Sequence, residues 1–199
     1  HNGIDQNAYA FDMDSPNEFI HLKHKGLKIV LFVGRITLQK GPEYFVEVAK
    51  RVAPYEPKAL FVMAGSGDME NQIINMAAEN KLSDKLLFTG FLRDRELSKM
   101  YKASDMFVMT SVSEPFGITA LEAIVHGTPL LVSKQSGVSE VVQNALKVDF
   151  WDIDEMANKI ISVLRYESLK RTLSKNAGDE IHELNWKKVA SKCINLYRK

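Results

Sequence analysis

Short apolar runs alternate with longer stretches of helical spacing along most of the chain. Six such runs occur, at 27–33, 59–64, 86–89, 106–110, 130–133 and 146–148. Apolar runs of this length, separated by polar turn residues, predict buried strands. Helical patterns lie between them, near 42–53, 69–81, 94–103, 117–126 and 137–144. Three more follow the last run, near 154–165, 167–179 and 186–197.

This alternation predicts the fold class. Strands that alternate with helices form βαβ units with right-handed crossovers, and the helices cover both faces of a parallel sheet. We therefore expect an α/β fold: a Rossmann-like, doubly wound parallel six-stranded sheet with extra C-terminal helices. In the common strand order 3-2-1-4-5-6, a ligand crevice opens at the carboxyl ends of the first and fourth strands. Residues 1–26 are polar and aperiodic, so we expect a linker segment there and one domain at 27–199.

Composition and charge exclude several classes of protein. With 199 residues, 45% of them hydrophobic and 26% charged, the chain resembles an ordinary soluble domain with a sizeable core. The net charge of +1 argues against a nucleic-acid-binding surface. No apolar run approaches the length of a membrane span, and there is no secretory signal. The single cysteine, Cys193, cannot form an internal disulfide, which suits a reducing compartment.

Two carboxylates bracket the segment that leads from the fourth predicted strand into the next helix. Glu122 lies in the middle of an apolar helix, and burying a carboxylate without a partner is costly. It therefore needs a hydrogen-bond donor, a cation or a ligand. Glu114 lies at the mouth of the loop, where Pro115 and Gly117 fix the backbone. The pair suggests a site for a polyhydroxylated, anionic ligand; the alternative is a helix-capping Glu114 and a salt-bridged Glu122.

The loop after the first predicted strand complements these carboxylates. Arg35 offers a planar fork of donors suited to phosphate oxygens, and Lys40 offers a mobile point charge. Gly34 and Gly41 let the backbone turn tightly and approach a ligand closely. Because the first and fourth strands are neighbours in the expected order, both loops should open into the same crevice. The alternative for Arg35 and Lys40 is a pair of solvated loop residues.

The predicted helix at 117–126 adds its N-terminus to this crevice. The free amides there belong to Gly117, Ile118 and Thr119, at the positive end of the helix dipole. Two cations and a helix N-terminus that converge on one crevice predict a diphosphate site.

Two motifs resemble those of a known family: Gly-Arg-x-x-x-x-Lys-Gly at 34–41 and Glu-Pro-Phe-Gly-x-x-x-x-Glu at 114–122. They are similar to the nucleotide-sugar-binding half of retaining glycosyltransferases with the GT-B fold (glycosyl transferases group 1, or family 4), which includes glycogen synthase-like and mannosyltransferase-like enzymes. The resemblance implies a second Rossmann-like domain, N-terminal to this one, that holds the acceptor. Because the chain begins with His1, we expect it to be part of a longer protein. Four further segments, at 2–5, 64–67, 89–92 and 136–140, also resemble this family.

By this resemblance, Arg35, Lys40 and Glu114 would form the catalytic set. The two cations would neutralise the diphosphate and the negative charge that grows on the leaving nucleotide, often the largest catalytic term. Glu114 would face the sugar ring, together with backbone amides of the loop. Glu122 would accept hydrogen bonds from both ribose hydroxyls, and Leu92 would pack on the base. The full nucleotide-sugar-binding set implied is Gly34, Leu92, Phe116, Gly117, Ile118, Thr119 and Glu122.

The resemblance implies no cofactor and no metal requirement. The sequence contains no His cluster, and Asp12-Met13-Asp14 lies in the linker segment, away from the expected crevice. The expected partners are a nucleotide-sugar donor and an acceptor glycan, lipid or small molecule, held by the N-terminal domain. We expect a cytoplasmic hexosyltransferase, with any peripheral membrane contact made through that domain, and an inactive isolated chain. Ser136-Gly137 stands where many relatives show two glycines, which leaves the geometry of that loop open.

Other interpretations account for less of the sequence. A nicotinamide-dinucleotide protein needs Gly-x-Gly-x-x-Gly after the first strand, whereas Gly65-Ser66-Gly67 is incomplete and follows the second. A P-loop motif is absent. A sugar-nucleotide epimerase of the GT-B type stays open because it could also place a Glu on ribose. A non-catalytic nucleotide-sugar-binding module stays open because the chain lacks an acceptor domain.

His126 is a further candidate, as a catalytic base. We favour a core or helix-capping residue, because it precedes Gly127 at a predicted helix end, where a cation suits the helix dipole.

Overall fold

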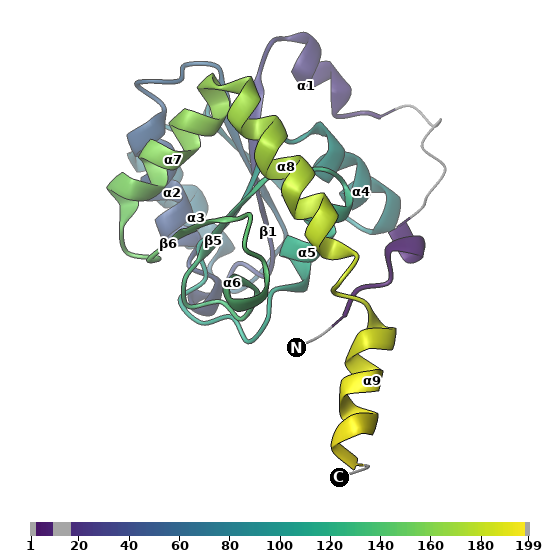
Figure 1. The fold of residues 1–199 in the computed structure, drawn as a ribbon. Coiled ribbons are helices and arrows are strands. Elements are labelled where there is room, and N and C mark those ends of the chain that lie inside the picture. The colour runs from purple at the N-terminus through teal and green to yellow at the C-terminus, as the bar shows by residue number, and fades with distance from the viewer. Residues whose placement is uncertain (1–2, 10–16, 198–199) are drawn as a thin grey trace.

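All six predicted strands form one parallel sheet in the computed structural model, which describes residues 3–9 and 17–197 (Figure 1). The strands run in the order β3-β2-β1-β4-β5-β6, and each pairs in parallel with its neighbours. The prediction of a Rossmann-like α/β fold with this strand order is confirmed. The strand bounds are β1 (Lys28–Val33), β2 (Ala59–Ala64), β3 (Leu86–Gly90), β4 (Met106–Met109), β5 (Leu130–Ser133) and β6 (Leu146–Val148).

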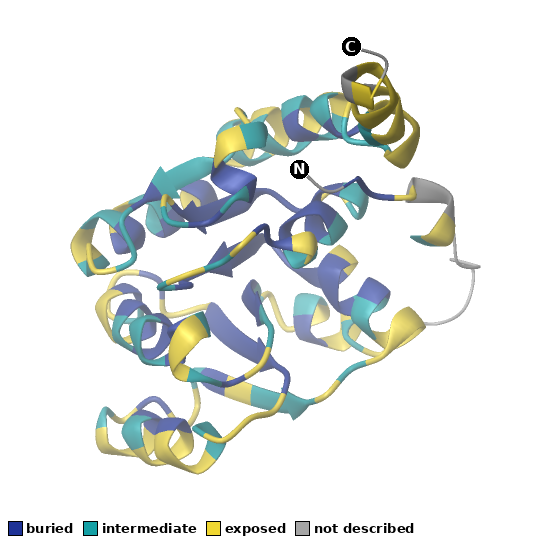
Figure 2. Cartoon of the chain, turned by 90° about the horizontal axis from the view of Figure 1, so that it is seen from below, coloured by how far each residue is buried: buried dark blue, intermediate teal, exposed yellow. Residues whose placement is uncertain are grey.

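Helices cover both faces of the sheet, and Figure 2 shows the buried residues gathered along the strands and the inner sides of these helices. One face carries α2 (Pro42–Val52), α3 (Glu70–Glu79) and α7 (Ile153–Arg165). The other carries α4 (Asp94–Ala103), α5 (Ile118–Val125), α6 (Val138–Val141) and α8 (Glu167–Ile181). The last helix, α9 (Trp186–Tyr197), extends away from this body in Figure 1. All eight predicted helices therefore form, within a few residues of the expected bounds.

The strand β1 explains why the predicted runs are continuously apolar. Val30 and Phe32 belong to the core under α2, α3 and α7, whereas Ile29 and Leu31 belong to the core on the other face. Successive side chains of a strand point to opposite faces, and here both faces are covered. Each fully buried side chain of this kind contributes about 1.5–3 kcal/mol. Polar side chains are therefore absent from the interiors of β1 and β2.

The segment before β1 contains structure that its polar, aperiodic sequence did not predict. Its described part forms η1 (Gln6–Tyr9) and α1 (Ile20–His24). Ile4 and Leu22 are buried in the core that contains α4, α5 and α8. The Ile4 N–H also donates to the Leu184 carbonyl at 2.8 Å, which fastens the segment to the turn before α9. One apolar anchor per short element gives no recognisable period. Asp12-Met13-Asp14 lies outside the described residues.

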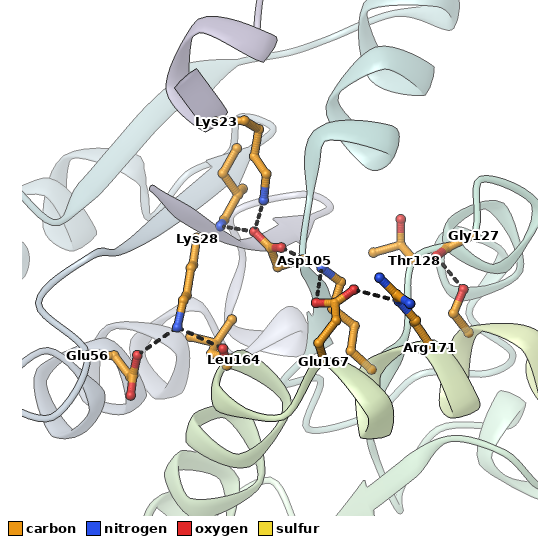
Figure 3. Close-up of polar contacts among 12 residues, drawn as sticks. Lys23, Lys28, Glu56, Asp105, Gly127, Thr128, Leu164, Glu167 and Arg171 are labelled. Atoms are coloured by element: carbon orange, nitrogen blue, oxygen red, sulfur yellow. Dashed lines mark hydrogen bonds and ion pairs between the residues drawn. The ribbon is translucent and has the colours of Figure 1, made fainter. Parts of the chain in front are cut away.

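Asp105 joins three elements at the amino ends of the strands (Figure 3). Its buried carboxylate accepts hydrogen bonds from the Ile29 N–H of β1 and from Lys170 Nζ of α8, both at 2.8 Å, and from Lys23 of α1. Burial raises the pKa of Asp105, but the hydrogen bonds and charges of Lys170 and Lys23 outweigh burial and leave that pKa below its usual value. The ionised carboxylate therefore stabilises the fold.

Asp105→Asn should lower the free energy of unfolding at neutral pH by about 1.5–3 kcal/mol, the range for hydrogen bonds to charged groups. Because the folded-state pKa lies below 3.8, this stability is present above that value and is lost as the pH falls through the folded pKa. The difference in the free energy of unfolding between the wild type and Asp105→Asn should therefore disappear at acidic pH. Urea denaturation at neutral and acidic pH measures this difference. The control is Asp84→Asn, at an exposed position. A similar loss of stability in the control would contradict this role of Asp105, as would a stability difference between wild type and Asp105→Asn that does not change with pH.

Candidate functional site

The exit loops of β1 and β4 lie against each other at the carboxyl edge of the sheet. The two strands are direct neighbours, and their loops continue the contact. The Val112 N–H donates to the Gln39 carbonyl at 3.0 Å, and the Thr110 hydroxyl donates to the Gly41 carbonyl at 2.7 Å. Gly41 has φ +60°, and a Cβ there would lie 2.5 Å from the Thr110 carbonyl oxygen. The strand order thus brings the two candidate loops together, as the sequence predicts.

Lys40 and Glu114 form an ion pair across this contact. Lys40 Nζ donates to Glu114 Oε2, and only 20% and 10% of the two side chains are exposed. The alternative, in which Lys40 is a solvated loop residue, is therefore wrong for this residue. Glu114 does not cap the following helix, because the N-cap of α5 is Gly117 and no side chain caps it. A carboxylate thus holds the cation at the edge of the crevice.

Arg35 differs from Lys40 in its surroundings. It is exposed and forms no ion pair with any other described residue. It lines a pocket of about 460 Å³ at the carboxyl ends of β1, β2 and β3. Five of the predicted site residues line this pocket: Gly34, Arg35, Leu92, Thr119 and Glu122.

The pocket also contains residues to which the sequence analysis assigned no role. Gly65 and Ser66 follow β2, and Phe91 follows β3. Gly65 has φ +146°, and a Cβ there would lie 1.9 Å from the Gly34 carbonyl oxygen. The loops after β1 and β2 therefore pack against each other at a position that only glycine fits. All three residues lie in the segments 64–67 and 89–92 that resemble the family, and the strand order could have placed them in the site, because β2 and β3 lie beside β1 in the sheet.

The other predicted residues lie outside the lining of this pocket. Phe116 is 8% exposed and packs in the core, and Ile118 begins α5 at 40% exposure. Gly117 has φ +104° at the N-cap. The loop after β5 closes over this segment, since the Val138 N–H donates to the Phe116 carbonyl at 2.6 Å. Ser136 is buried there and donates to the Ser133 carbonyl at 2.6 Å, which settles how a serine fits at this position.

Glu122 receives its hydrogen bonds from two tyrosines. The Tyr9 hydroxyl donates to Oε1 at 2.9 Å, and the Tyr101 hydroxyl donates to Oε2 at 3.0 Å. Among the described residues, the partners of the Glu122 side chain are thus neutral hydroxyl groups. The alternative of a salt-bridged Glu122 is therefore wrong for this part of the chain. Burial raises the pKa of Glu122, although the hydrogen bonds from Tyr9 and Tyr101 act in the opposite direction.

His126 is the C-cap residue of α5. Its Nδ1–H donates to the Glu122 backbone carbonyl at 2.7 Å, and its ring stacks on Tyr101 with centroids 5.4 Å apart. Its predicted place at the helix end is confirmed. Burial lowers the pKa of His126, which disfavours the cation that was expected there. The ring faces a separate cavity of about 260 Å³, which it shares with Tyr9, Tyr101 and Glu122.

The described residues offer neither a cluster of metal ligands nor a helix that could span a membrane. No group of three or more His, Cys, Asp or Glu side chains within residues 3–9 and 17–197 could hold a metal ion. None of the helices in that part of the chain is both long and apolar enough to cross a membrane.

Comparison with known proteins identifies the family. A model of the glycosyl transferases group 1 family matches residues 14–180. An uncharacterised glycosyltransferase of Methanocaldococcus jannaschii is 34% identical over 208 residues, covering 100% of this chain and 53% of the relative. The structure of sucrose-phosphate synthase from Thermosynechococcus elongatus has a TM-score of 0.81 at 27% identity, over 99% of this chain and 51% of that one. Anabaena HepE, in complex with UDP and glucose, has a TM-score of 0.80 at 22% identity, over 93% and 52% of the two chains.

The chain spans about half the length of these relatives. The family match, the shared fold and the two motifs on adjoining loops together show that the chain belongs to the glycosyl transferases group 1 family and has the fold of a C-terminal domain of the GT-B type.

Proposed function

We propose that this chain forms the donor-binding half of a retaining glycosyltransferase, which transfers a hexosyl group from a nucleoside-diphosphate sugar to an acceptor. The observation that carries the proposal is the pocket of about 460 Å³ at the carboxyl edge of the sheet. Its lining combines the guanidinium of Arg35, the first turn of α5 at Thr119 and the carboxylate of Glu122. The first two suit phosphate, and the carboxylate suits ribose hydroxyls.

The diphosphate would lie between Arg35 and the N-terminus of α5. Lys40, held by Glu114, would add a second cation at this end of the site. A diphosphate would offer Lys40 another anionic partner, which would free Glu114 to accept a hydrogen bond from a sugar hydroxyl. As the glycosidic bond breaks, negative charge grows on the leaving nucleotide, and these fixed cations would stabilise it.

The nucleoside would occupy the opposite end of the pocket. Glu122 would accept hydrogen bonds from the two ribose hydroxyls, because a carboxylate has about four lone-pair sites and the tyrosines use two. Leu92 would pack against the base. Phe91, 66% exposed at the rim with the Arg93 guanidinium 5.6 Å from its ring centroid, would offer a second apolar surface.

The transfer step would need a second domain. The relatives are about twice as long as this chain, and a facing domain would bind the acceptor and exclude water when the two close. In this scheme no metal is required, because the cations and the helix N-terminus carry the phosphate charge.

A thermal-shift panel of UDP, GDP, ADP and their sugar conjugates tests the proposal on the 199-residue chain. One nucleotide should raise the Tm, because a ligand that binds only the native state stabilises it. The chain alone should transfer no sugar, whereas the full-length protein should transfer it with retention at the anomeric carbon. Products formed without an acceptor would indicate an epimerase, and binding without turnover in the full-length protein would indicate a binding module. No shift with any nucleotide would reject donor binding.

Arg35→Ala and Lys40→Ala should each lower the turnover of the full-length protein by about 100-fold, as the loss of one preorganised donor does. Their effects on stability should differ. Arg35 is exposed, so its removal should leave the free energy of unfolding unchanged. Lys40→Ala removes the ion-pair partner of Glu114, whose side chain is only 10% exposed, and should cost roughly 1–3 kcal/mol. Steady-state kinetics and urea denaturation measure the two effects. The control is Lys50→Ala, on the exposed side of α2; normal turnover in either site variant would remove that residue from the diphosphate site.

Glu122→Gln should weaken nucleotide binding by about 1.5–3 kcal/mol, because an amide accepts less strongly than a carboxylate. A 2′,3′-dideoxy nucleotide should bind the wild type about as poorly as the intact nucleotide binds the variant. Isothermal titration calorimetry measures these affinities.

Unfolding experiments provide the control for Glu122→Gln. Burial raises the folded-state pKa of Glu122 above 4.5, so its contribution to stability is present below that pH and is lost as the pH rises through the folded pKa. The Gln variant should therefore gain stability relative to the wild type between acidic and neutral pH. A variant that unfolds at neutral pH while ribose selectivity stays unchanged would make Glu122 a structural residue.

A further inference from the structure

Glu122 lines two cavities. One is the pocket of about 460 Å³ that is also lined by Arg35 and Thr119, and the other is the cavity of about 260 Å³ that is also lined by Tyr9, Tyr101 and His126. Glu122 and Leu97 are common to the two linings. Groups in the smaller cavity can therefore act on the carboxylate without occupying the larger pocket.

The two tyrosines fix the carboxylate from the smaller cavity. Each hydroxyl donates to a different oxygen, Tyr9 to Oε1 and Tyr101 to Oε2. The terminal torsion of a glutamate is broad and roughly two-fold, so an unrestrained carboxylate rotates easily. Two donors on two oxygens define the plane of the group and leave its other lone pairs for a further ligand.

Tyr101 is built to remain a hydrogen-bond donor. It is fully buried, stacks on His126 and packs beside Phe107 with ring centroids 6.0 Å apart. Burial and the charge of Glu122 raise the pKa of Tyr101 far above its usual value, so the hydroxyl keeps its proton. Its position on α4 is separated from Glu122 by 21 residues of sequence.

Tyr9 reaches the same carboxylate from the segment before the sheet, 113 residues away in sequence. Its position depends on buried neighbours, because Ile4 lies in the core and is bonded to the Leu184 carbonyl. Its ring meets His126 edge-on at 5.9 Å between centroids. The segment before β1 thus supplies one wall of the Glu122 site.

We propose that Tyr9 and Tyr101 are positioning residues that orient Glu122 toward the ribose of the bound donor. This role rests on the proposed function of Glu122 as the ribose acceptor. It adds that ribose recognition depends on a residue from the segment before the domain, as well as on the helix that carries the glutamate.

The test measures discrimination between a nucleoside diphosphate and its 2′,3′-dideoxy form by calorimetry. The probe is whichever of UDP, GDP and ADP gives the largest thermal shift with the wild type. Tyr9→Phe and Tyr101→Phe should each lower the affinity for the intact nucleotide by about three- to tenfold, the effect of one hydrogen bond. The affinity for the dideoxy form should stay unchanged. The double variant should approach the weak discrimination of Glu122→Gln.

The exposed Tyr55 supplies the matched control, since Tyr55→Phe removes a hydroxyl distant from Glu122 and should preserve discrimination. If Tyr101→Phe disturbs folding, the partly exposed Tyr9 carries the test alone. Unchanged discrimination in the variants would overturn the positioning role and leave the proposed function intact. Tighter binding by Tyr9→Phe would also overturn it, because Tyr9 would then compete with ribose. A wild type without discrimination would overturn the ribose role of Glu122 together with this inference.

Discussion

The burial of the parallel sheet on both faces is the constraint on which the rest of the structure depends. β2 is buried at all six positions, and β1 contributes alternate side chains to two separate cores. No polar group can lie along these strands without a large desolvation cost. Charged residues are therefore found at the strand ends: Asp105 and its lysines join the amino ends, and the candidate site gathers at the carboxyl ends.

The two charged ends of the sheet have different consequences. At the amino end, Asp105 has two lysine partners, so ionisation favours the folded state. At the carboxyl end, Glu122 has two neutral tyrosine partners, which offset its burial only in part. A carboxylate that is incompletely compensated retains the capacity to accept further hydrogen bonds. Such a group suits binding more than stability.

Both ends of the described chain contribute to the surroundings of this site. The segment that carries Tyr9 is fastened through Ile4 to the turn before α9, and α9 itself leaves the body of the domain. The relatives are about twice as long as this chain. The walls of the site include a residue of the segment before β1, and this segment is hydrogen-bonded to the turn before α9.

The sequence by itself determined the six strands, the eight main helices and the two candidate loops, because continuous apolar runs and helical spacing report local burial. The strand order was expected only as the common order of this fold class, and the structure has that order. It also showed that Glu122 needs a partner. Only the tertiary structure decided that its partners are Tyr9 and Tyr101 and that no lysine or arginine among the described residues pairs with it. The structure also decided that Lys40 pairs with Glu114 and that His126 is buried, which lowers its pKa. These contacts join residues up to 113 positions apart. No periodic pattern encodes them, because periodicity reports which positions are buried, whereas the packing of distant elements decides which polar groups meet there.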